Sequence, residues 1–366
     1  MAELSKEDTP MNLRTGGQRA AEKNRAIVIW LIVCCGMVVA MMLIGAITRL
    51  TESGLSMVEW RPLIGAFPPI SDTEWRRVFD LYRKTSEYRL ENAGMSLAEF
   101  KTIFWWEFIH RLWGRLIGAA FGLPLIWFAV RGYLTKPLAL RLFVLFLLGG
   151  VQGAIGWWMV KSGLVDRADV SQYRLTVHLG MAFLILGAML WVVLGLTDHR
   201  SAAPPVSPRL RRYAAGLLLL IFVTALSGGL VAGLDAGYAY NDWPYMNGQV
   251  IPEEYGDLTP WWINLFENIA AVQFDHRLLA YSSVLGALFL WITAWRNGLR
   301  RLARRPFDLL VIMALVQVAL GVSTRLLVVP TPLAVAHQGG AIALFCLAVW
   351  AVHTVYRNPA APAQSS

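Results

Sequence analysis

Long apolar stretches recur along the whole chain, each separated from the next by a polar or charged connection. A helix of about 20 apolar residues spans the roughly 30 Å hydrocarbon core of a bilayer. The pattern therefore predicts an all-α polytopic membrane protein with eight transmembrane helices. These helices are expected at 26–48, 104–130, 138–160, 173–197, 212–233, 268–295, 307–328 and 333–356.

Composition and charge fit this interpretation. Hydrophobic residues make up 56% of the 366 residues and charged residues 16%, a balance that a soluble domain of this length does not need. The net charge of +9 comes from Lys and Arg that collect in alternate connections, whereas the segment 234–267 has six acidic residues and no Lys or Arg. By the positive-inside rule, both termini are expected in the cytoplasm. The basic charge thus indicates topology and not nucleic-acid binding.

The first outer loop, 49–103, is too long to be a plain connection. Ser71 with Glu74, and Ser96 with Glu99, form two capping-box patterns, each of which predicts the start of a helix. Apolar residues recur at helical spacing after the first pattern, so we expect an amphipathic helix that lies on the membrane surface. The second pattern is expected to begin the helix that continues into the second span.

Short matches relate the two halves of the chain, which divide at a proline-containing polar segment. Glu-Phe-Ile-His-Arg-Leu at 107–112 matches Gln-Phe-Asp-His-Arg-Leu at 273–278. Three further matches keep the same order in both halves: Gly54 and Trp60 with Gly237 and Trp243, Gln152 and Gly156 with Gln317 and Gly321, and His178 with His337. Together they predict a tandem duplication, with four spans in each copy.

The duplication predicts two tandem four-helix bundles related by pseudo-two-fold symmetry. The expected organisation is a cytoplasmic tail at 1–25, an N-terminal bundle at 26–197 with its outer loop at 49–103, a cytoplasmic linker at 198–211, a C-terminal bundle at 212–356 and a cytoplasmic tail at 357–366.

Four histidines lie at one depth, each a few residues inside the outer end of an even-numbered span: His110, His178, His276 and His337. A single intramembrane histidine is more often a packed, hydrogen-bonded residue than a ligand. In an up-down bundle, however, the second and fourth helices are diagonal neighbours, so each half places two imidazoles opposite one another. Two opposed imidazoles can hold a heme iron from both sides. Glycines on the same spans would leave room for the macrocycle, or serve close helix packing.

Cations lie near the same level and suit the anionic propionates of a heme. They are Arg111, Arg115 and Lys161 in the first half and Arg277 and Arg325 in the second. Charged groups in the membrane are costly unless they are paired, which favours propionate contacts. The alternative is that the longer side chains reach to the interfacial water.

The repeat breaks at one informative position. Glu107 stands one turn before His110, whereas its counterpart before His276 is Gln273. An intramembrane carboxylate is expected either to pair with Arg111 or Arg115, or to take part in chemistry. If only the first pocket does chemistry, Glu107 can stabilise positive charge or move protons there.

These residues resemble one known family. The run at 107–111, the segment Thr51-Glu-Ser-Gly-Leu-Ser56 followed by Glu59-Trp-Arg-Pro62, the eight spans in two repeats and the four histidines are together similar to the heme A synthases of the proteobacterial and mitochondrial branch. The resemblance covers roughly residues 26–356.

The resemblance implies a heme-modifying membrane oxidoreductase of cytochrome oxidase assembly, which oxidises the C8 methyl of heme O to a formyl group. It implies that His110 and His178 hold the substrate heme iron, with Glu107 as the catalytic residue beside it, and that His276 and His337 hold the iron of a heme b cofactor. It places the chain in the bacterial inner membrane. The expected partners are heme O, membrane lipid, heme O synthase, an electron donor and further copies of the chain.

The residues fit three other classes less well. Zinc would need more ligands than two histidines in each bundle. A di-heme b-type cytochrome would relay electrons without modifying heme, and it predicts that Glu107→Gln spares activity. A two-repeat transporter would need a polar path through the midplane, for which the spans offer few residues.

Overall fold

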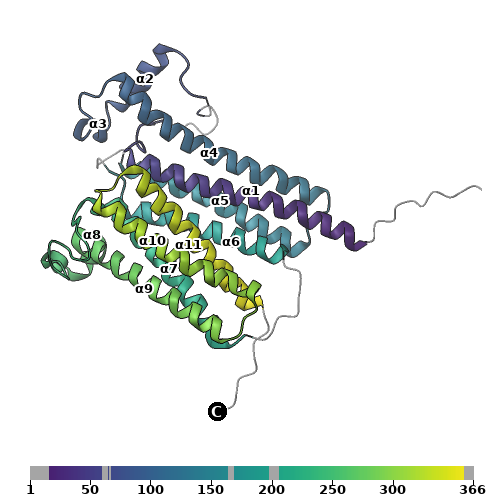
Figure 1. Ribbon diagram of the computed structural model, residues 1–366. Coiled ribbons are helices and arrows are strands. Elements are labelled where there is room, and N and C mark those ends of the chain that lie inside the picture. The colour runs from purple at the N-terminus through teal and green to yellow at the C-terminus, as the bar shows by residue number, and fades with distance from the viewer. Residues whose placement is uncertain (1–15, 60–64, 66, 164–168, 198–205, 358–366) are drawn as a thin grey trace, which may run out of the picture.

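The computed structural model describes residues 16–59, 65, 67–163, 169–197 and 206–357, and it is all-helical apart from loops (Figure 1). Eight of its helices are long and apolar enough to cross a membrane. They are α1 (Gly16–Leu50), α4 (Leu97–Val130), α5 (Lys136–Gly163), α6 (Gln172–Thr197), α7 (Pro208–Gly233), α9 (Ile269–Arg296), α10 (Arg301–Leu326) and α11 (Thr331–Arg357). The eight predicted spans are thereby confirmed.

Helix ends differ from the expected ones by a few residues, with two larger differences. Helix α1 begins at Gly16, ten residues before the expected span, so part of the predicted tail is helical. Helix α4 begins at Leu97, ahead of the apolar run, where the Ser96–Glu99 capping box was predicted to start it. Residues 1–15 and 358–366 of the two predicted tails, 198–205 of the predicted linker and 60–62 of the quoted motif lie outside the described residues.

The long helices form two groups of four. In the first half α1 and α5 each pack against α4 and α6, and in the second half α7 and α10 each pack against α9 and α11. Helix α4 therefore lies opposite α6, and α9 lies opposite α11. The halves meet where α6 packs on α7 and α11, and where α1 packs on α11. Each helix has the neighbours that a duplication requires, while the pseudo-two-fold axis stays a prediction.

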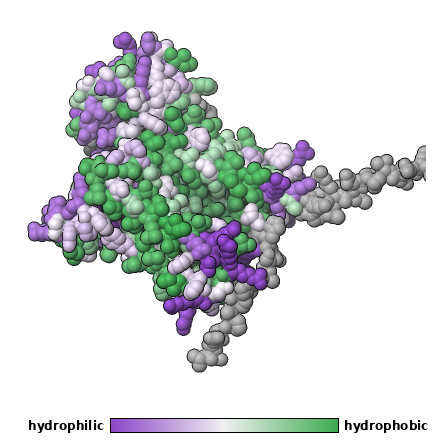
Figure 2. All heavy atoms as spheres, viewed as in Figure 1, coloured by the Kyte–Doolittle hydropathy of each residue, from purple (hydrophilic) through white to green (hydrophobic). Residues whose placement is uncertain are grey.

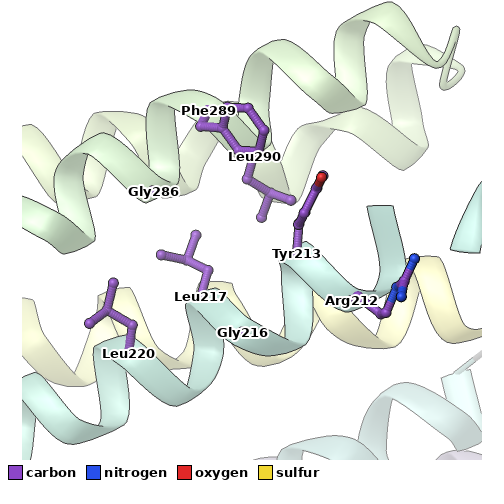
Figure 3. Close-up of a pocket in the computed structure, with 8 residues that line it drawn as sticks. All are labelled: Arg212, Tyr213, Gly216, Leu217, Leu220, Gly286, Phe289 and Leu290. Carbon is purple, nitrogen blue, oxygen red and sulfur yellow. The ribbon is translucent and has the colours of Figure 1, made fainter. Parts of the chain in front are cut away.

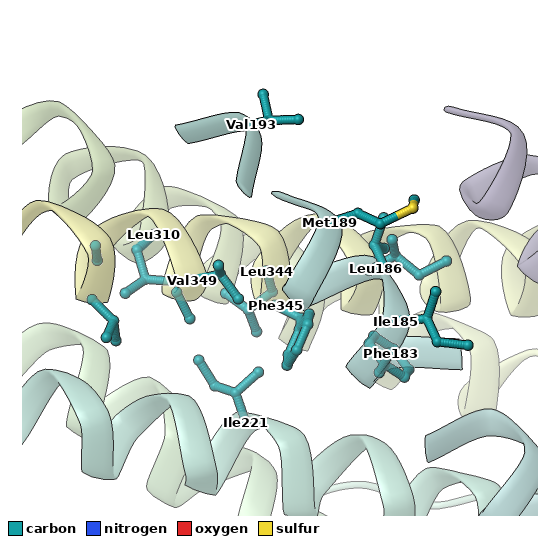
Figure 4. Close-up of a cluster of buried hydrophobic side chains, with 14 of the residues drawn as sticks. Phe183, Ile185, Leu186, Met189, Val193, Ile221, Leu310, Leu344, Phe345 and Val349 are labelled. Carbon is teal, nitrogen blue, oxygen red and sulfur yellow. The ribbon is translucent and has the colours of Figure 1, made fainter. Parts of the chain in front are cut away.

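Large apolar side chains fill the contact between the halves (Figure 4). Phe183 of α6 and Phe345 of α11 meet edge to face, with ring centroids 5.1 Å apart. Gly187 lets these helices approach, because a methyl group at that position would lie 3.0 Å from the Phe345 ring. Lipid tails are as apolar as these side chains, so close van der Waals packing is what holds the two halves together in a membrane.

The connections at one end of the bundles carry the remaining helices, and we call this end the loop end. They are α2 (Asp72–Tyr82), α3 (Ser86–Leu90), three short 3₁₀ turns (Ala236–Tyr238, Glu253–Gly256 and Trp261–Ile263) and α8 (Asn264–Glu267). In Figure 2 hydrophilic side chains gather here and at the opposite end, and apolar ones cover most of the surface between them. This is the surface that a membrane-spanning protein shows to lipid.

Helix α2 packs on protein, which differs from the expected position on the membrane surface. The Ser71 side chain accepts from Glu74 N and starts the helix, as predicted. Its apolar face, however, is covered by the projecting first turns of α4. Trp75 contacts Phe104 and Tyr82 contacts Phe100, with ring centroids 4.9 and 5.2 Å apart.

Candidate heme sites

Each of the four histidines lies against a glycine of the preceding long helix. A methyl group placed on that glycine would lie 2.9–3.7 Å from the imidazole ring. The pairs are His110 with Gly45, His178 with Gly156, His276 with Gly228 and His337 with Gly321. A methyl group at Gly156, Gly228 or Gly321 would crowd the ring, whereas one at Gly45 would make an ordinary van der Waals contact with it.

The pairs also follow the repeat. Gly45 and Gly228 keep the same spacing to the matched residues Gly54 and Gly237, and Gly156 and Gly321 were already matched. The sequence analysis did not connect Gly45 or Gly156 with the histidines. A signal in the sequence could have identified these contacts: each histidine helix is preceded by a helix with a glycine at a position that matches in the two halves.

Contacts from neighbouring helices orient the second pair of rings. Ser227 Oγ lies 2.8 Å from His276 Nδ1, and Gln317 Nε2 lies 3.1 Å from His337 Nδ1. A histidine that binds a metal commonly uses its other ring nitrogen for such a contact. The Ser227 hydroxyl can accept from His276 Nδ1, which leaves Nε2 of that ring as the nitrogen that can bind iron. The Gln317 amide nitrogen only donates, so His337 Nδ1 is the acceptor in its contact.

The first pair has a different environment. Gln152 Nε2 donates to the backbone oxygen of His178, as Gln317 does to that of His337. His178 Nδ1, however, is buried without a hydrogen-bond partner. His178 lies close enough to His110 to interact with it electrostatically, and the same holds for His276 and His337. The two rings of each half are thus neighbours on opposite helices.

Glu107 is almost fully buried and tied to the first outer loop. Its carboxylate accepts from Ser56 Oγ at 2.7 Å and from Met57 N at 2.6 Å, and it forms an ion pair with Arg111. The carboxylate therefore holds the loop against α4 by accepting hydrogen bonds from loop residues. Its ion-pair partner, Arg111, is one of the two arginines expected from the sequence.

Gln273 occupies the matching place in the second half, where it donates hydrogen bonds to the loop instead of accepting them from it. Its Nε2 donates to Ala236 O and Ala239 O, both at 2.6 Å, while its Oε1 accepts from Arg277 and Arg325. An amide can donate and accept, whereas a carboxylate only accepts. The Glu/Gln difference therefore matches a difference in the loops that these residues hold.

Arg111 and Arg277 attach the loops to α4 and α9 in the same way. Arg111 Nη2 donates to Met57 O at 2.8 Å, and Arg277 Nη2 donates to Tyr240 O at 3.1 Å. Met57 and Tyr240 hold matching places in the repeat, three residues after Gly54 and Gly237 respectively. This anchoring role could not be predicted from the sequence, because every residue has a backbone carbonyl and residue types do not show which one accepts the bond.

The remaining cations differ in their surroundings. Arg325 Nη2 donates to the backbone oxygens of Tyr240 and Asp242, the latter at 2.6 Å. The Nε atoms of Arg277 and Arg325 are buried and lack a hydrogen-bond partner. Arg115 is half-buried one turn beyond Arg111. Lys161 is exposed, with its ammonium 5.4 Å from the ring centroid of Trp157.

The glycines expected to make room for a macrocycle have different surroundings, with Gly228 and Gly321 against histidines and Gly122, Gly339 and Gly340 against other side chains. A methyl group at Gly180 would lie 2.7 Å from Leu226, and one at Gly229 would lie 3.0 Å from Thr176, so these two serve packing between the halves. Around Gly118, Gly149, Gly150 and Gly153 there is open space within 4 Å of an added methyl group.

A surface groove between α7 and α9 lies away from the histidines (Figure 3). Apolar side chains and two glycines line it, with Arg212 and Tyr213 toward the start of α7. Gly216 is about 18 Å along α7 from Gly228, which contacts His276. No titratable group other than these two lines the groove, so we give it no part in heme chemistry.

Comparison with known proteins adds independent information. Residues 28–349 match the COX15-CtaA family of cytochrome oxidase assembly proteins. The heme A synthase of Rhodospirillum centenum is 53% identical over 351 residues, which cover 96% of this chain and 94% of the relative. The heme A synthase of Nitrosospira multiformis is 50% identical over 336 residues, covering 91% and 94%. That of Paramagnetospirillum magneticum is 51% identical over 341 residues, covering 92% and 95%.

Proposed function

The chain belongs to the heme A synthase family, whose enzymes convert heme O to heme A, and we propose how its two halves divide that work. The N-terminal half holds the substrate, heme O, between His110 and His178. The C-terminal half holds a heme b between His276 and His337. The substrate is oxidised at its C8 methyl, which becomes a formyl group.

The observation that carries this proposal is the glycine under each histidine. A glycine removes the side chain that would otherwise touch the imidazole, and it occurs four times at matching places. Neutral imidazoles on opposite helices suit an iron held from both sides, and an iron with this ligation exchanges single electrons. The two halves thus share an arrangement of histidines and glycines and differ in the contacts around it, including those of Glu107.

Glu107 supports the assignment of the chemistry to the first half. It lies on α4 one turn from His110, and its carboxylate is held rigid by Ser56, Met57 and Arg111. Replacing two C–H bonds of a methyl group by a C=O bond requires that hydrogen leave the carbon. A fixed carboxylate at that place can accept a proton. Gln273, at the matching place, cannot act as such a base.

Arginines at the loop end support propionate binding. The buried Nε groups of Arg277 and Arg325 are donors without a partner, and an anionic oxygen would satisfy both. In the first half we assign the propionates to Arg111, Arg115 and Lys161. The two arginines of the second half already hold the loop, so a bound propionate would join the loop and the helices in one network.

The position in the cell follows from charge. We assign the loop end to the outer face of the bacterial inner membrane and both termini to the cytoplasm, because Lys and Arg collect at the opposite end. Heme O synthase, an electron donor and further copies of the chain remain proposed partners.

Extraction of pigments tests the function. Cells that supply heme O and express the chain are expected to contain a heme with a formyl group, which His110→Met and Glu107→Ala abolish. Glu91→Ala, an exposed carboxylate of the same loop, serves as control and should leave the yield unchanged. Heme O that stays unmodified in cells with the wild-type chain would contradict the assignment.

A further inference from the structure

A second buried carboxyl group lies in the connection between α1 and α4. Glu87, in the short helix α3, is 5% exposed, and its Oε2 has no hydrogen-bond partner. Nothing in the sequence pattern marks this residue, because most residues around it in the sequence are polar. A carboxyl group that leaves water without full hydrogen bonding is costly to fold, which suggests a role other than packing.

Glu87 connects to the loop surface through Tyr82. The Tyr82 side chain is fully buried, and its hydroxyl lies near enough to the Glu87 carboxyl group to influence its pKa. Its hydroxyl also accepts from Asn92 Nδ2 at 2.9 Å, and Asn92 is partly exposed. A path of hydrogen-bonding groups therefore runs from a buried acid to the water at the loop end.

Other acids surround Glu87 from each neighbouring element. They are Glu107 of α4, Glu52 after α1 and Asp169 before α6. Burial, together with these negative charges, raises the pKa of Glu87 to about 8. Glu87 therefore carries a proton at neutral pH, while the Glu107 carboxylate pairs with Arg111. Two nearby acids in different protonation states are typical of proton-transfer sites.

We propose that Glu87 is a proton-carrying residue of the first pocket, coupled through space to Glu107, that exchanges protons with the water at the loop end through Tyr82. The proposal rests on the function given above, in which Glu107 accepts a proton from the substrate. Glu87 touches neither substrate nor iron, so it acts through Glu107.

The transfer is balanced in protons and charge. When Glu107 takes up a proton, its negative charge disappears and the repulsion that holds the proton on Glu87 weakens. The O–H bond of Glu87 then breaks, its proton passes to the Tyr82 oxygen, and the Tyr82 hydroxyl proton passes to water beside Asn92. Glu107 has then gained one proton and Glu87 has lost one, so the summed charge of the two groups stays the same. One proton enters and one leaves, and no electron moves.

Infrared titration of the purified full-length protein tests the proton on Glu87 independently of catalysis. The carbonyl stretch of a protonated carboxyl group should disappear with a midpoint near pH 8 in the wild type. It should be absent in Glu87→Gln and present in Glu91→Gln, the exposed control. A band that persists unchanged in Glu87→Gln would overturn the proposal.

Coupling is tested by the midpoint of the same band. In Glu107→Gln the midpoint should fall by about 1 unit, because a like charge has been removed. An unchanged midpoint in a variant that still binds heme would contradict the coupling. If Glu107→Gln does not fold, the rate of heme A formation in membranes that contain Glu87 variants tests the proposal instead.

Glu87→Gln should slow formation of heme A by about tenfold or more while the spectrum of the bound hemes stays that of the wild type. Glu87→Asp should recover most of the rate. A wild-type rate in Glu87→Gln from pH 6 to 9 would overturn the relay. Failure of the wild type to form heme A would instead contradict the proposed function, and the infrared result would still stand.

Discussion

A glycine beneath each imidazole is the feature that sets the site at the scale of single residues. A buried ring keeps one orientation only where its surroundings leave one fitting space, and close-packed interiors adjust poorly to an added methyl group. The sequence predicted the four histidines and their pairing. It did not predict what positions them, since glycine occurs 31 times in the chain and residue type alone does not tell which copies face a ring.

Gly156→Ala tests this role. The added methyl group would lie 3.0 Å from His178 Cε1, so the ring must move, and under the proposed ligation its bond to iron weakens. We expect heme content of the first pocket to fall about 10-fold or more, with the second pocket unchanged. Heme content of the purified protein, measured by absorption, provides the readout.

Gly149→Ala is the matched control on the same helix, because an added methyl group there has no neighbour within 4 Å. It should bind heme as the wild type does. Equal heme content in both variants would show that the contact with His178 is not needed.

Helix α4 links loop and pocket at the scale of elements. Its first turns project from the apolar span, cover α2 and carry the chain on to Glu107 and His110. The eight spans were predictable because a long apolar segment in lipid must satisfy its own backbone, which a helix does. The packing of α2 against α4 was not predictable, because an amphipathic face fits a membrane surface as well as it fits another helix.

Ser96→Ala should destabilise the start of α4. The Ser96 side chain accepts from Glu99 N at 3.3 Å, and the Glu99 carboxylate accepts from Ser96 N at 2.8 Å. Loss of such a cap costs about 1 kcal/mol, which speeds amide exchange about fivefold in the first turn of the helix. Thr102→Ala, exposed on the same helix, should leave exchange there unchanged. Hydrogen exchange with mass spectrometry gives the comparison, and equal protection in the two variants would refute the cap.

The whole molecule combines two halves that share a plan and differ in the contacts of Glu107 and Gln273. Matching helices have matching neighbours, matching glycines lie under the histidines, and Arg111 and Arg277 hold matching loop residues. The sequence matches predicted this plan, because a duplication preserves residues at fixed spacing. The contacts that give Glu107 and Gln273 their different surroundings could not be predicted, since they come from loop backbone that lies far away in the sequence.

The heme content of His178→Ala and of His337→Ala tests the central claim, that each half holds one heme between its own two histidines. The variants are to be purified from cells that supply heme O, and their pigments separated and counted. His178→Ala should lose the substrate heme and its oxidised products while retaining heme b, and His337→Ala should lose heme b. Loss of the same pigment from both variants, or from neither, would contradict the assignment of the two pockets.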